Sequence, residues 1–412
     1  MGKIIDEATR RKIIASLANE FARLRFTALP SHIAHNNWEE YTYEYGKWYL
    51  HKFLQRRSGG MEVDYGLSKF FSALERTNLI DAIYQVSDQN DWVDFLRKTL
   101  VESCFVIELF RKYAKKELRG PDDPIFNMPE NLHKVRCDLI LHHDQLPPFF
   151  VLVEFFAIQD DTFSCLAQYK LIDLALLFFE NWVGHPLKLS RNNGNQIHEI
   201  KDLVDLVQKA LSVPIAAETS ITMESDIELH FINYAIELQE AGVKFKRMKG
   251  NNLEIKFQNG VLEIPPIKVA ENTTLFLLQT LMVYERNTLP DSAPRNVNDY
   301  VKFIQCLINS PKDVELLRRS GIIENWLGND QLIVDKLIKL GNISKTSHNF
   351  TYSGIFTKVN EHCGRRRNIW MANLWTNYFN SPWSFISFLA AVVLLLLTVT
   401  QTIFAILSYH PS

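Results

Sequence analysis

The chain has 412 residues, of which 47% are apolar and 22% are charged, as in ordinary globular proteins. This composition excludes a disordered, collagen-like or coiled-coil chain, and the length allows roughly two to three domains. The 45 basic and 47 acidic side chains give a net charge of −2, so no overall attraction to nucleic acid is expected. The charges are unevenly placed, because Arg367 is the last formally charged side chain.

The five cysteines are far apart and form no C-x-x-C pair, which is typical of reduced thiols rather than of a disulfide framework or a structural zinc site. The first 30 residues lack the continuous apolar core of a signal peptide. Their apolar residues instead recur at helical spacing between charges, which predicts an amphipathic surface helix.

An N-terminal helical region is expected over residues 1–211. Within it, the dense apolar residues of Trp92–Leu118 predict a helix that is buried in its middle. Its basic end, Lys112–Arg119, is expected to be a solvated helix end rather than a nucleic-acid site. The polar stretch 212–225 is the predicted linker to the next region.

A second helical region, residues 226–367, contains the clear β signal of the sequence. Two stretches of alternating polarity flank Asn259-Gly260, a pair that favours a type I′ turn because both residues tolerate positive φ. A hairpin is therefore predicted over residues 253–264. Its register pairs three sets of residues: Phe257 with Leu262, Ile255 with Ile264, and Lys256 with Glu263.

Helices are expected on both sides of this hairpin. Asp226–Ala241 has helical spacing, and Gly242 is placed to end that helix. Ser310-Pro311 supplies an N-cap and a first-turn proline for another helix. The helix Asp330–Leu340 is expected to stop at Gly341.

The apolar run Ile386–Leu407 has 22 residues and would span about 33 Å as a helix, against a bilayer hydrocarbon core of about 30 Å. Its few polar residues cluster near one end and form no stripe along it, so a transmembrane helix is favoured over a buried helix of a soluble protein. The residues chosen to represent this membrane anchor are Ile386, Leu394, Leu397 and Leu407.

The residues before this run predict its orientation. Arg365, Arg366 and Arg367 precede it and no Lys or Arg follows, so the positive-inside rule places the N-terminal body in the cytosol. The interfacial segment 368–385 carries four aromatic residues expected at the membrane surface: Trp370, Trp375, Tyr378 and Trp383. This is the layout of a single-pass, tail-anchored protein. The glycosylation sequons at Asn272, Asn342 and Asn349 would then be unused.

The polar and small residues inside the run allow two interpretations of how this helix behaves in the membrane. Gln401 and the threonines beside it could hydrogen-bond a partner helix, and Ser387-x-x-x-Ala391 has a spacing found between packed membrane helices. Alternatively, the threonines bond their own backbone and the glutamine is tolerated near the far interface. The second reading is favoured.

No G-x-G-x-x-G, Walker A, H-E-x-x-H or G-x-S-x-G motif is present in the sequence, so no catalytic, cofactor-binding or metal-binding residue is assigned. A membrane-surface enzyme is the alternative function, and its acid–base groups would come from Glu102, Glu108, His142 or Asp144. His142 and His143 would not easily hold one metal ion, because neighbouring helical residues point about 100° apart.

Several segments, in this order, resemble one plant family. They are Glu102–Arg111, Cys137–Leu152, Ala241–Lys246, Gly260–Pro265, Asp313–Leu317, Gly321–Gly328 and Tyr378–Trp383. Together they resemble the family known as domain of unknown function 247, over roughly Lys47 to Leu407. The resemblance implies a mostly helical plant membrane protein with one C-terminal anchor and no established catalytic activity. Some grass members of the family are associated with self-incompatibility, which implies recognition rather than catalysis.

The chain departs from the family pattern at three places: Leu29–His35, Glu102-Ser103 and Leu141–Pro147. An activity that depended on these boxes would be altered in this member. The overall expectation is a mainly α fold, with a multi-helix globular body, a small β-hairpin and one C-terminal transmembrane helix. The expected function is recognition of, or signalling to, a protein partner at a lipid bilayer, without nucleic acid or cofactor.

Overall fold

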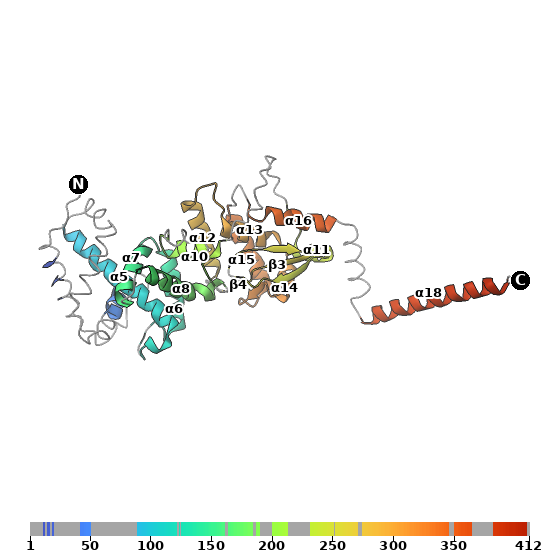
Figure 1. Ribbon diagram of the computed structural model, residues 1–412, viewed down its shortest axis with the longest axis horizontal. Helices are drawn as coiled ribbons and strands as arrows, with labels where there is room; N and C mark the ends of the chain where they lie inside the picture. Colours follow the sequence, from blue (N-terminus) through green and yellow to red (C-terminus); the bar gives the residue numbers. More distant parts are fainter. Residues whose placement is uncertain are drawn as a thin grey trace. The chain divides into compact units, whose positions relative to one another are not determined.

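The computed structural model describes residues 11–12, 15–16, 19, 42–50, 89–121, 123, 125–160, 164–183, 187–189, 200–212, 231–250, 252–270, 274–345, 350–364 and 382–409. The chain is mainly helical with small strands, which confirms the predicted fold class (Figure 1). It forms two compact units: residues 1–212 with 272–284, and residues 213–271 with 285–412. The predicted domain limits stay a prediction, and residues 213–225 of the predicted linker lie outside the described residues.

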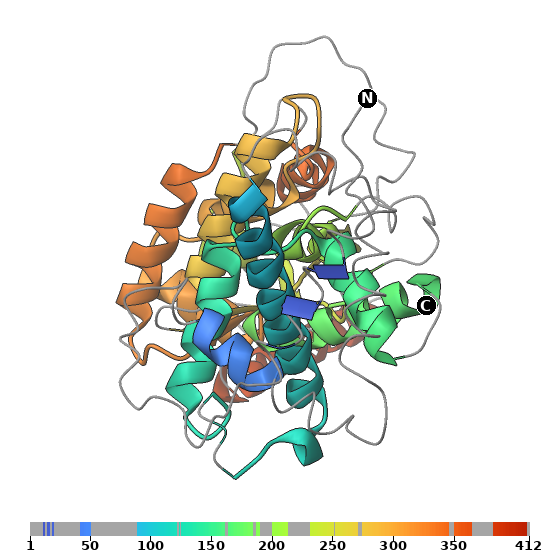
Figure 2. The same cartoon turned by 90° about the vertical axis from the view of Figure 1, so that its left-hand side faces the viewer.

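The first unit is a helical bundle built around α5, which spans Gln89–Ala114. Every residue from Thr99 to Phe110 is buried, because apolar side chains cover all sides of this part of the helix. Helix α8 packs against α5, α7 and α10. The helical residues 42–50 also lie against α5 (Figure 2), and the Tyr49 ring stacks on the Phe105 ring of α5. The further helices of the unit are α6 (Pro129–Leu141), α7 (Phe149–Asp160), α8 (Ser164–Val183) and α10 (Leu203–Leu211).

The C-terminal end of α5 differs from its prediction. The α-helix stops at Ala114, and a short 3-10 turn, η1 (Lys116–Leu118), follows it. Lys115 and Lys116 are exposed as expected, but Lys112 is only 2% exposed. The expectation of a solvated end was therefore wrong for Lys112, whose charge has a buried partner.

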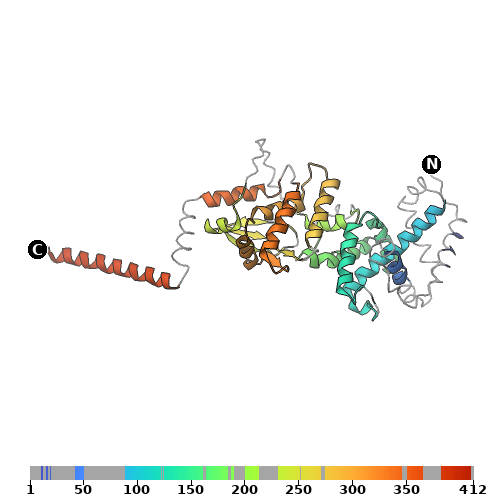
Figure 3. The ribbon, with the colours of Figure 1, turned by 180° about the vertical axis from the view of Figure 1, so that it is seen from behind.

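The second unit combines short strands with helices (Figures 1 and 3). A three-stranded sheet has the order β1-β3-β2, and two further strands, β4 and β5, pair in parallel. Helix α13 packs on α15, and α14 packs on α11, α15 and β5. The elements are α11 (Ala235–Glu240), β1 (Lys244–Arg247), β2 (Lys256–Gln258), β3 (Val261–Ile264), β4 (Ile267–Val269), α13 (Asn296–Cys306), α14 (Pro311–Arg319), β5 (Ile323–Asn325), α15 (Asp330–Ile343) and α16 (Ser353–Gly364). Helix α12 (Thr274–Thr288) contributes its residues up to Tyr284 to the first unit.

The predicted hairpin is present as β2 and β3. Phe257 pairs with Leu262 and Lys256 with Glu263, as the sequence indicated. Both turn residues have positive φ, 51° at Asn259 and 75° at Gly260, as a type I′ turn requires. The expected pair of Ile255 with Ile264 lies just beyond the ladder, because β2 begins at Lys256. The sequence did not indicate β1, which pairs in parallel with β3.

Two predicted helix boundaries were wrong. Residues 231–234 are not helical, so α11 begins at Ala235 rather than at Asp226. Helix α15 does not stop at Gly341 but continues to Ile343. A Cβ atom at position 341 would lie 2.4 Å from the Gln305 side chain, so this glycine serves the close approach of α13 and α15 rather than helix termination. The N-terminal capping box of α14, with Ser310 and Asp313, is present at the predicted cap.

Candidate functional site

The candidate site for membrane attachment is α18, which spans Pro382–Tyr409. Its window Ile386–Phe404 has 19 residues, contains no Asp, Glu, Lys or Arg, and is long and apolar enough to cross a bilayer. At about 1.5 Å per residue this window covers about 28 Å. Its side chains are exposed, with Leu394 at 64%.

Helix α8 shows why this exposure matters. It has 20 residues and is also rich in Leu and Phe, but one side of it, which includes Leu171, Phe178 and Phe179, is fully buried in the first unit. It also carries Lys170, Asp173 and Glu180, as a core helix with a solvated side does. Helix α18 has neither feature within Ile386–Phe404, so this helix has the length and composition of a membrane span without being a core helix of the described residues.

The threonines of α18 are compatible with a lipid environment. The hydroxyl of Thr398 donates to the carbonyl of Leu394 at 2.8 Å, and that of Thr402 donates to the carbonyl of Thr398 at 2.7 Å. Thr400 bonds the carbonyl of Leu396 in the same way. These polar groups are therefore satisfied within their own helix, as a bilayer core requires.

The structure describes some of the residues predicted for membrane attachment and not others. Ile386, Leu394, Leu397 and Leu407 lie on the single helix α18. Trp383 also lies in this helix, but nothing is described of its side chain. The predicted orientation and interfacial residues lie outside the described residues: Arg365, Arg366, Arg367, Trp370, Trp375 and Tyr378.

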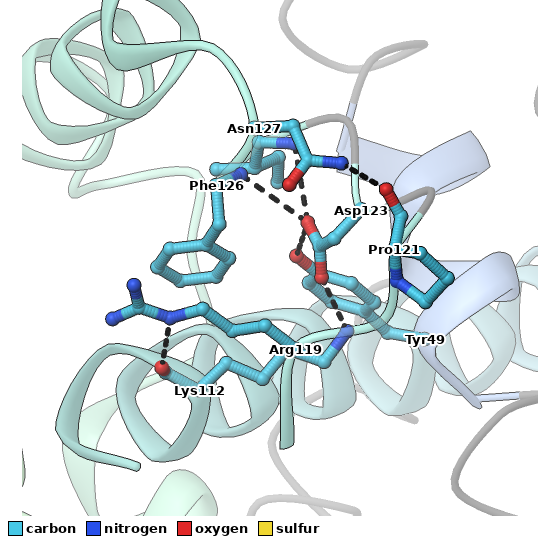
Figure 4. A network of polar contacts seen from close by, with 8 residues as sticks. Tyr49, Lys112, Arg119, Pro121, Asp123, Phe126 and Asn127 are labelled. Carbon is cyan, nitrogen blue, oxygen red and sulfur yellow. Dashed lines mark hydrogen bonds and ion pairs between the residues drawn. The ribbon is translucent and has the colours of Figure 1, made fainter. Parts of the chain in front are cut away.

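A buried ionic cluster fixes one end of the first unit (Figure 4). Lys112 Nζ lies 2.7 Å from Asp123 Oδ2, and the side chains are 2% and 0% exposed. Asp123 Oδ1 accepts hydrogen bonds from the Tyr49 hydroxyl and from the backbone N–H groups of Ile125 and Phe126, at 3.2–3.3 Å. The cluster thus joins α5, the segment 42–50 and the loop before α6, which is a structural role.

Arg119 completes the framework of this loop. Its Nε donates to the backbone carbonyl of Lys112 at 2.7 Å, and its guanidinium group lies over the Phe126 ring. These contacts hold the loop beside the buried Lys112–Asp123 pair. The basic segment that the sequence indicated contributes packing and hydrogen bonds here.

The candidate acid–base residues are distributed along different elements. Glu102 and Glu108 are buried on α5, and each has a basic residue about one turn away: Lys98 Nζ at 3.9 Å and Arg111 Nη1 at 3.5 Å. His142 caps the C-terminal end of α6, and Asp144 is exposed in the turn that follows. No group of three His, Cys, Asp or Glu side chains suited to a metal ion occurs among the described residues.

A pairing that the sequence did not indicate involves His143 and Asp202. His143 Nδ1 lies 3.1 Å from Asp202 Oδ2, and the imidazole ring meets the Tyr284 ring edge-on. The hydrogen bond to Asp202 raises the pKa of His143 above its usual 6.5, against the opposing effect of burial. Asp202 also caps α10 by accepting from the Asp205 N–H at 2.8 Å. The two residues are 59 positions apart, so no local pattern could have revealed them.

The described thiols have structural surroundings. Cys104, Cys137, Cys306 and Cys363 are free, as the spacing of the cysteines predicted. Burial raises the pKa of Cys137 to about 11. This thiol is therefore protonated at neutral pH and unsuited to act as a nucleophile.

Taken together, the fold defines a mainly helical protein with one described helix suited to membrane insertion. The chain belongs to a family of plant proteins of unknown function, domain of unknown function 247, whose family model matches residues 30–397. The resemblance seen in the sequence is thereby confirmed, and the match extends into α18.

Two relatives come from Arabidopsis thaliana. The chain is similar to the UPF0481 protein At3g47200, with 24% identity over 404 residues, covering 89% of this chain and 81% of that protein. It is also similar to the UPF0481 protein At3g02645, with 30% identity over 177 residues, covering 40% of this chain and 31% of that protein. No solved structure matches the chain.

Proposed function

We propose that this plant protein is anchored in a membrane by α18 and that its helical body recognises a protein partner on the cytosolic side. The observation that carries the proposal is the uncharged, exposed surface of α18 over Ile386–Phe404. A surface of this kind is unfavourable in water and favourable in hydrocarbon. The internally bonded threonines support the same environment.

The charges before α18 support a cytosolic body. Arg365, Arg366 and Arg367 are the last formal charges of the sequence and lie within 22 residues of Ile386. Basic residues close to a membrane span are retained on the cytosolic side. Asn342 lies in a glycosylation sequon, and its side-chain oxygen accepts a hydrogen bond from Gln305. Because sequons on the cytosolic side stay unmodified, a glycan at Asn342 would contradict this orientation.

Recognition is supported by the absence of catalytic motifs from the sequence and by the surface of the second unit. Trp326 is 66% exposed, and Lys268 Nζ lies 4.3 Å from the centre of its ring. An exposed indole beside an ammonium group offers both apolar area and charge, and tryptophan is enriched among the residues that dominate protein interfaces. Trp326 is the residue that we propose for the partner contact.

The anchor is tested by alkaline extraction of plant microsomes that contain the full chain with an N-terminal tag. We expect the chain to stay in the pellet and a variant without residues 386–407 to be released. A variant with leucines throughout 386–407 is the matched control and should stay in the pellet. Release of the full chain would contradict the anchor.

Orientation and recognition need separate measurements. Protease added to sealed microsomes should remove the N-terminal tag, and protection of the tag would contradict the cytosolic body.

Proximity labelling from that tag should recover a set of neighbours that is lost without residues 386–407. Trp326→Ala should lower the recovery of a protein that binds directly to the helical body. Met128→Ala changes an exposed residue of the first unit and should leave that recovery unchanged. Unchanged neighbours in the anchor deletion would contradict the proposal.

A further inference from the structure

We infer that α18 pairs inside the membrane with α18 of a second copy of this chain, through Gln401. This inference rests on the proposed anchoring and adds the partner that the helix meets in the bilayer. It depends on three features of α18: the unmet hydrogen bonds of Gln401, the depth of this residue, and the face on which it lies.

Gln401 differs from the threonines beside it. The hydroxyls of Thr398, Thr400 and Thr402 donate to carbonyls one turn earlier. The Gln401 side chain makes no hydrogen bond within the part of the chain that the structure describes. Its carboxamide has two N–H donors and a carbonyl acceptor, which a partner outside the helix can satisfy.

Within the proposed anchor, the position of Gln401 along α18 keeps this carboxamide inside the hydrocarbon, rather than at the far interface as the sequence favoured. At about 1.5 Å per residue, it lies about 22 Å beyond Ile386. The apolar residues 403–407 continue the hydrocarbon-compatible stretch for a further distance of about 8 Å. A carboxamide at this depth lies inside a hydrocarbon core of about 30 Å, where an unpaired polar group is costly.

Small residues share the face of Gln401. At about 100° per residue, one arc of about 100° contains Gln401 and five other described residues of the window. These are Ser387, Ala390, Ala391, Leu394 and Thr398. Every serine and alanine of Ile386–Phe404 lies in this arc, whereas the remaining positions carry large side chains or threonine. Small residues allow two helix backbones to approach closely, so the carboxamides can come within hydrogen-bonding distance.

The α18 helix of a second copy of this chain is the partner that is complementary to the Gln401 face. A carboxamide is both donor and acceptor, so it is complementary to itself. Each copy inserted in the same orientation presents Gln401 at the same depth and on the same small-residue face. A two-fold axis along the bilayer normal therefore brings Gln401 against Gln401 in a parallel pair.

The test uses the full chain in membranes, with a photo-cross-linking amino acid placed at position 394 or at position 396. Leu394 lies on the Gln401 face, and Leu396 lies on the opposite side of the helix. We expect cross-linked homodimer from position 394 and at least several-fold less from position 396. Gln401→Leu should lower the yield from position 394 about three- to tenfold, as expected for losing a hydrogen bond between membrane helices. Gln401→Asn should retain most of it, and Thr400→Val is the matched control that should leave it unchanged.

Alkaline extraction of each variant separates the two proposals. If the wild-type chain is released by alkali, the anchor is wrong and the pairing is wrong with it. If the chain is retained but gives no homodimer, only the pairing is overturned. Equal yields from positions 394 and 396, a yield that does not respond to Gln401→Leu, or an adduct with a different protein alone would also overturn it.

Discussion

The ammonium nitrogen of Lys112 lies 2.7 Å from a carboxylate oxygen of Asp123, and the two side chains are 2% and 0% exposed. Each charge is costly to bury alone, so the pair is stable only as a unit. The Tyr49 ring lies 3.8 Å from the same ammonium group and further covers it. This relationship holds the loop after α5 in place and makes the stability of the first unit sensitive to either partner.

Removing only one charge of this pair should be more harmful than removing both. Asp123→Ala should lower the free energy of unfolding by about 3–5 kcal/mol, because it leaves Lys112 buried and unpaired. Lys112→Met combined with Asp123→Asn should cost less, since Asn keeps an oxygen for the Ile125 and Phe126 N–H groups. Urea unfolding of the detergent-solubilised chain measures both. As a control, Arg97→Met at the exposed pair with Asp94 should cost less than about 1 kcal/mol. A double variant as unstable as Asp123→Ala would refute this account.

The pair of His143 with Asp202 should make stability depend on pH. The pKa of His143 is raised in the folded chain, so the protonated form is favoured there over the unfolded chain, whose pKa is about 6.5. The stabilisation is complete below pH 6.5 and is lost as the pH rises through the folded-state pKa. The carboxylates of Asp202 and Asp144 are the charged groups that act on this ring, and both favour the protonated imidazole.

Unfolding measured between pH 5.5 and pH 8 should show this loss in the wild type and much less of it in Asp202→Asn. His142→Gln, at the neighbouring position, is the control and should keep the wild-type slope. The same slope in Asp202→Asn would argue against the pair as its source.

Substitution of Gly260 should disturb the hairpin for two reasons. Its φ of +75° is unfavourable for other residues, and an added Cβ would lie 2.8 Å from the His362 ring on α16. Gly328 has the same φ but nothing within 4 Å of such a Cβ, so Gly328→Ala isolates the backbone cost of about 1–2 kcal/mol. Gly260→Ala should therefore destabilise the chain by more than Gly328→Ala. Equal losses in thermal unfolding would show that His362 moves aside freely.

Glu285 should be important for the start of α13. Its carboxylate accepts from the backbone N–H groups of Val297 and Asn298 at 3.0 Å and from the Asn298 amide at 2.9 Å, and the residue is fully buried. Glu285→Gln puts an amide nitrogen against one of these donors and should cost about 1.5–3 kcal/mol. Arg286→Gln at the exposed next position should change stability by less than about 0.5 kcal/mol. Comparable effects of the two changes in urea unfolding would be evidence against the role of Glu285.

Local patterns explain what could be predicted from the sequence. The Asn259-Gly260 turn sets its own backbone angles and thereby the register of β2 and β3. Ser310 and Pro311 start α14 through contacts within a single turn. The apolar surface of α18 depends on composition alone. Each of these features is determined by residues that are close in the chain.

The features that escaped prediction depend on distant residues. The partner of β3 on its other edge is β1, and β4 pairs with β5 more than fifty residues away. Lys112 looked solvated because its counter-ion, Asp123, comes from the following loop. Gly341 looked like a helix stop, although its real constraint is the Gln305 side chain on α13. His143 and Asp202 likewise meet only after α6, α7, α8 and α10 have assembled.

The division of the first unit has a consequence for synthesis on the ribosome. This unit contains residues 1–212 but also residues 272–284, the start of α12 with the buried Leu277 and Leu281. Its last piece therefore emerges only after part of the second unit has been made. At about 5–20 residues per second, the nascent first unit waits roughly 4 to 14 s with an incomplete core. During that interval its apolar surface is open to chaperones, and a fragment ending at residue 212 would remain permanently in this state.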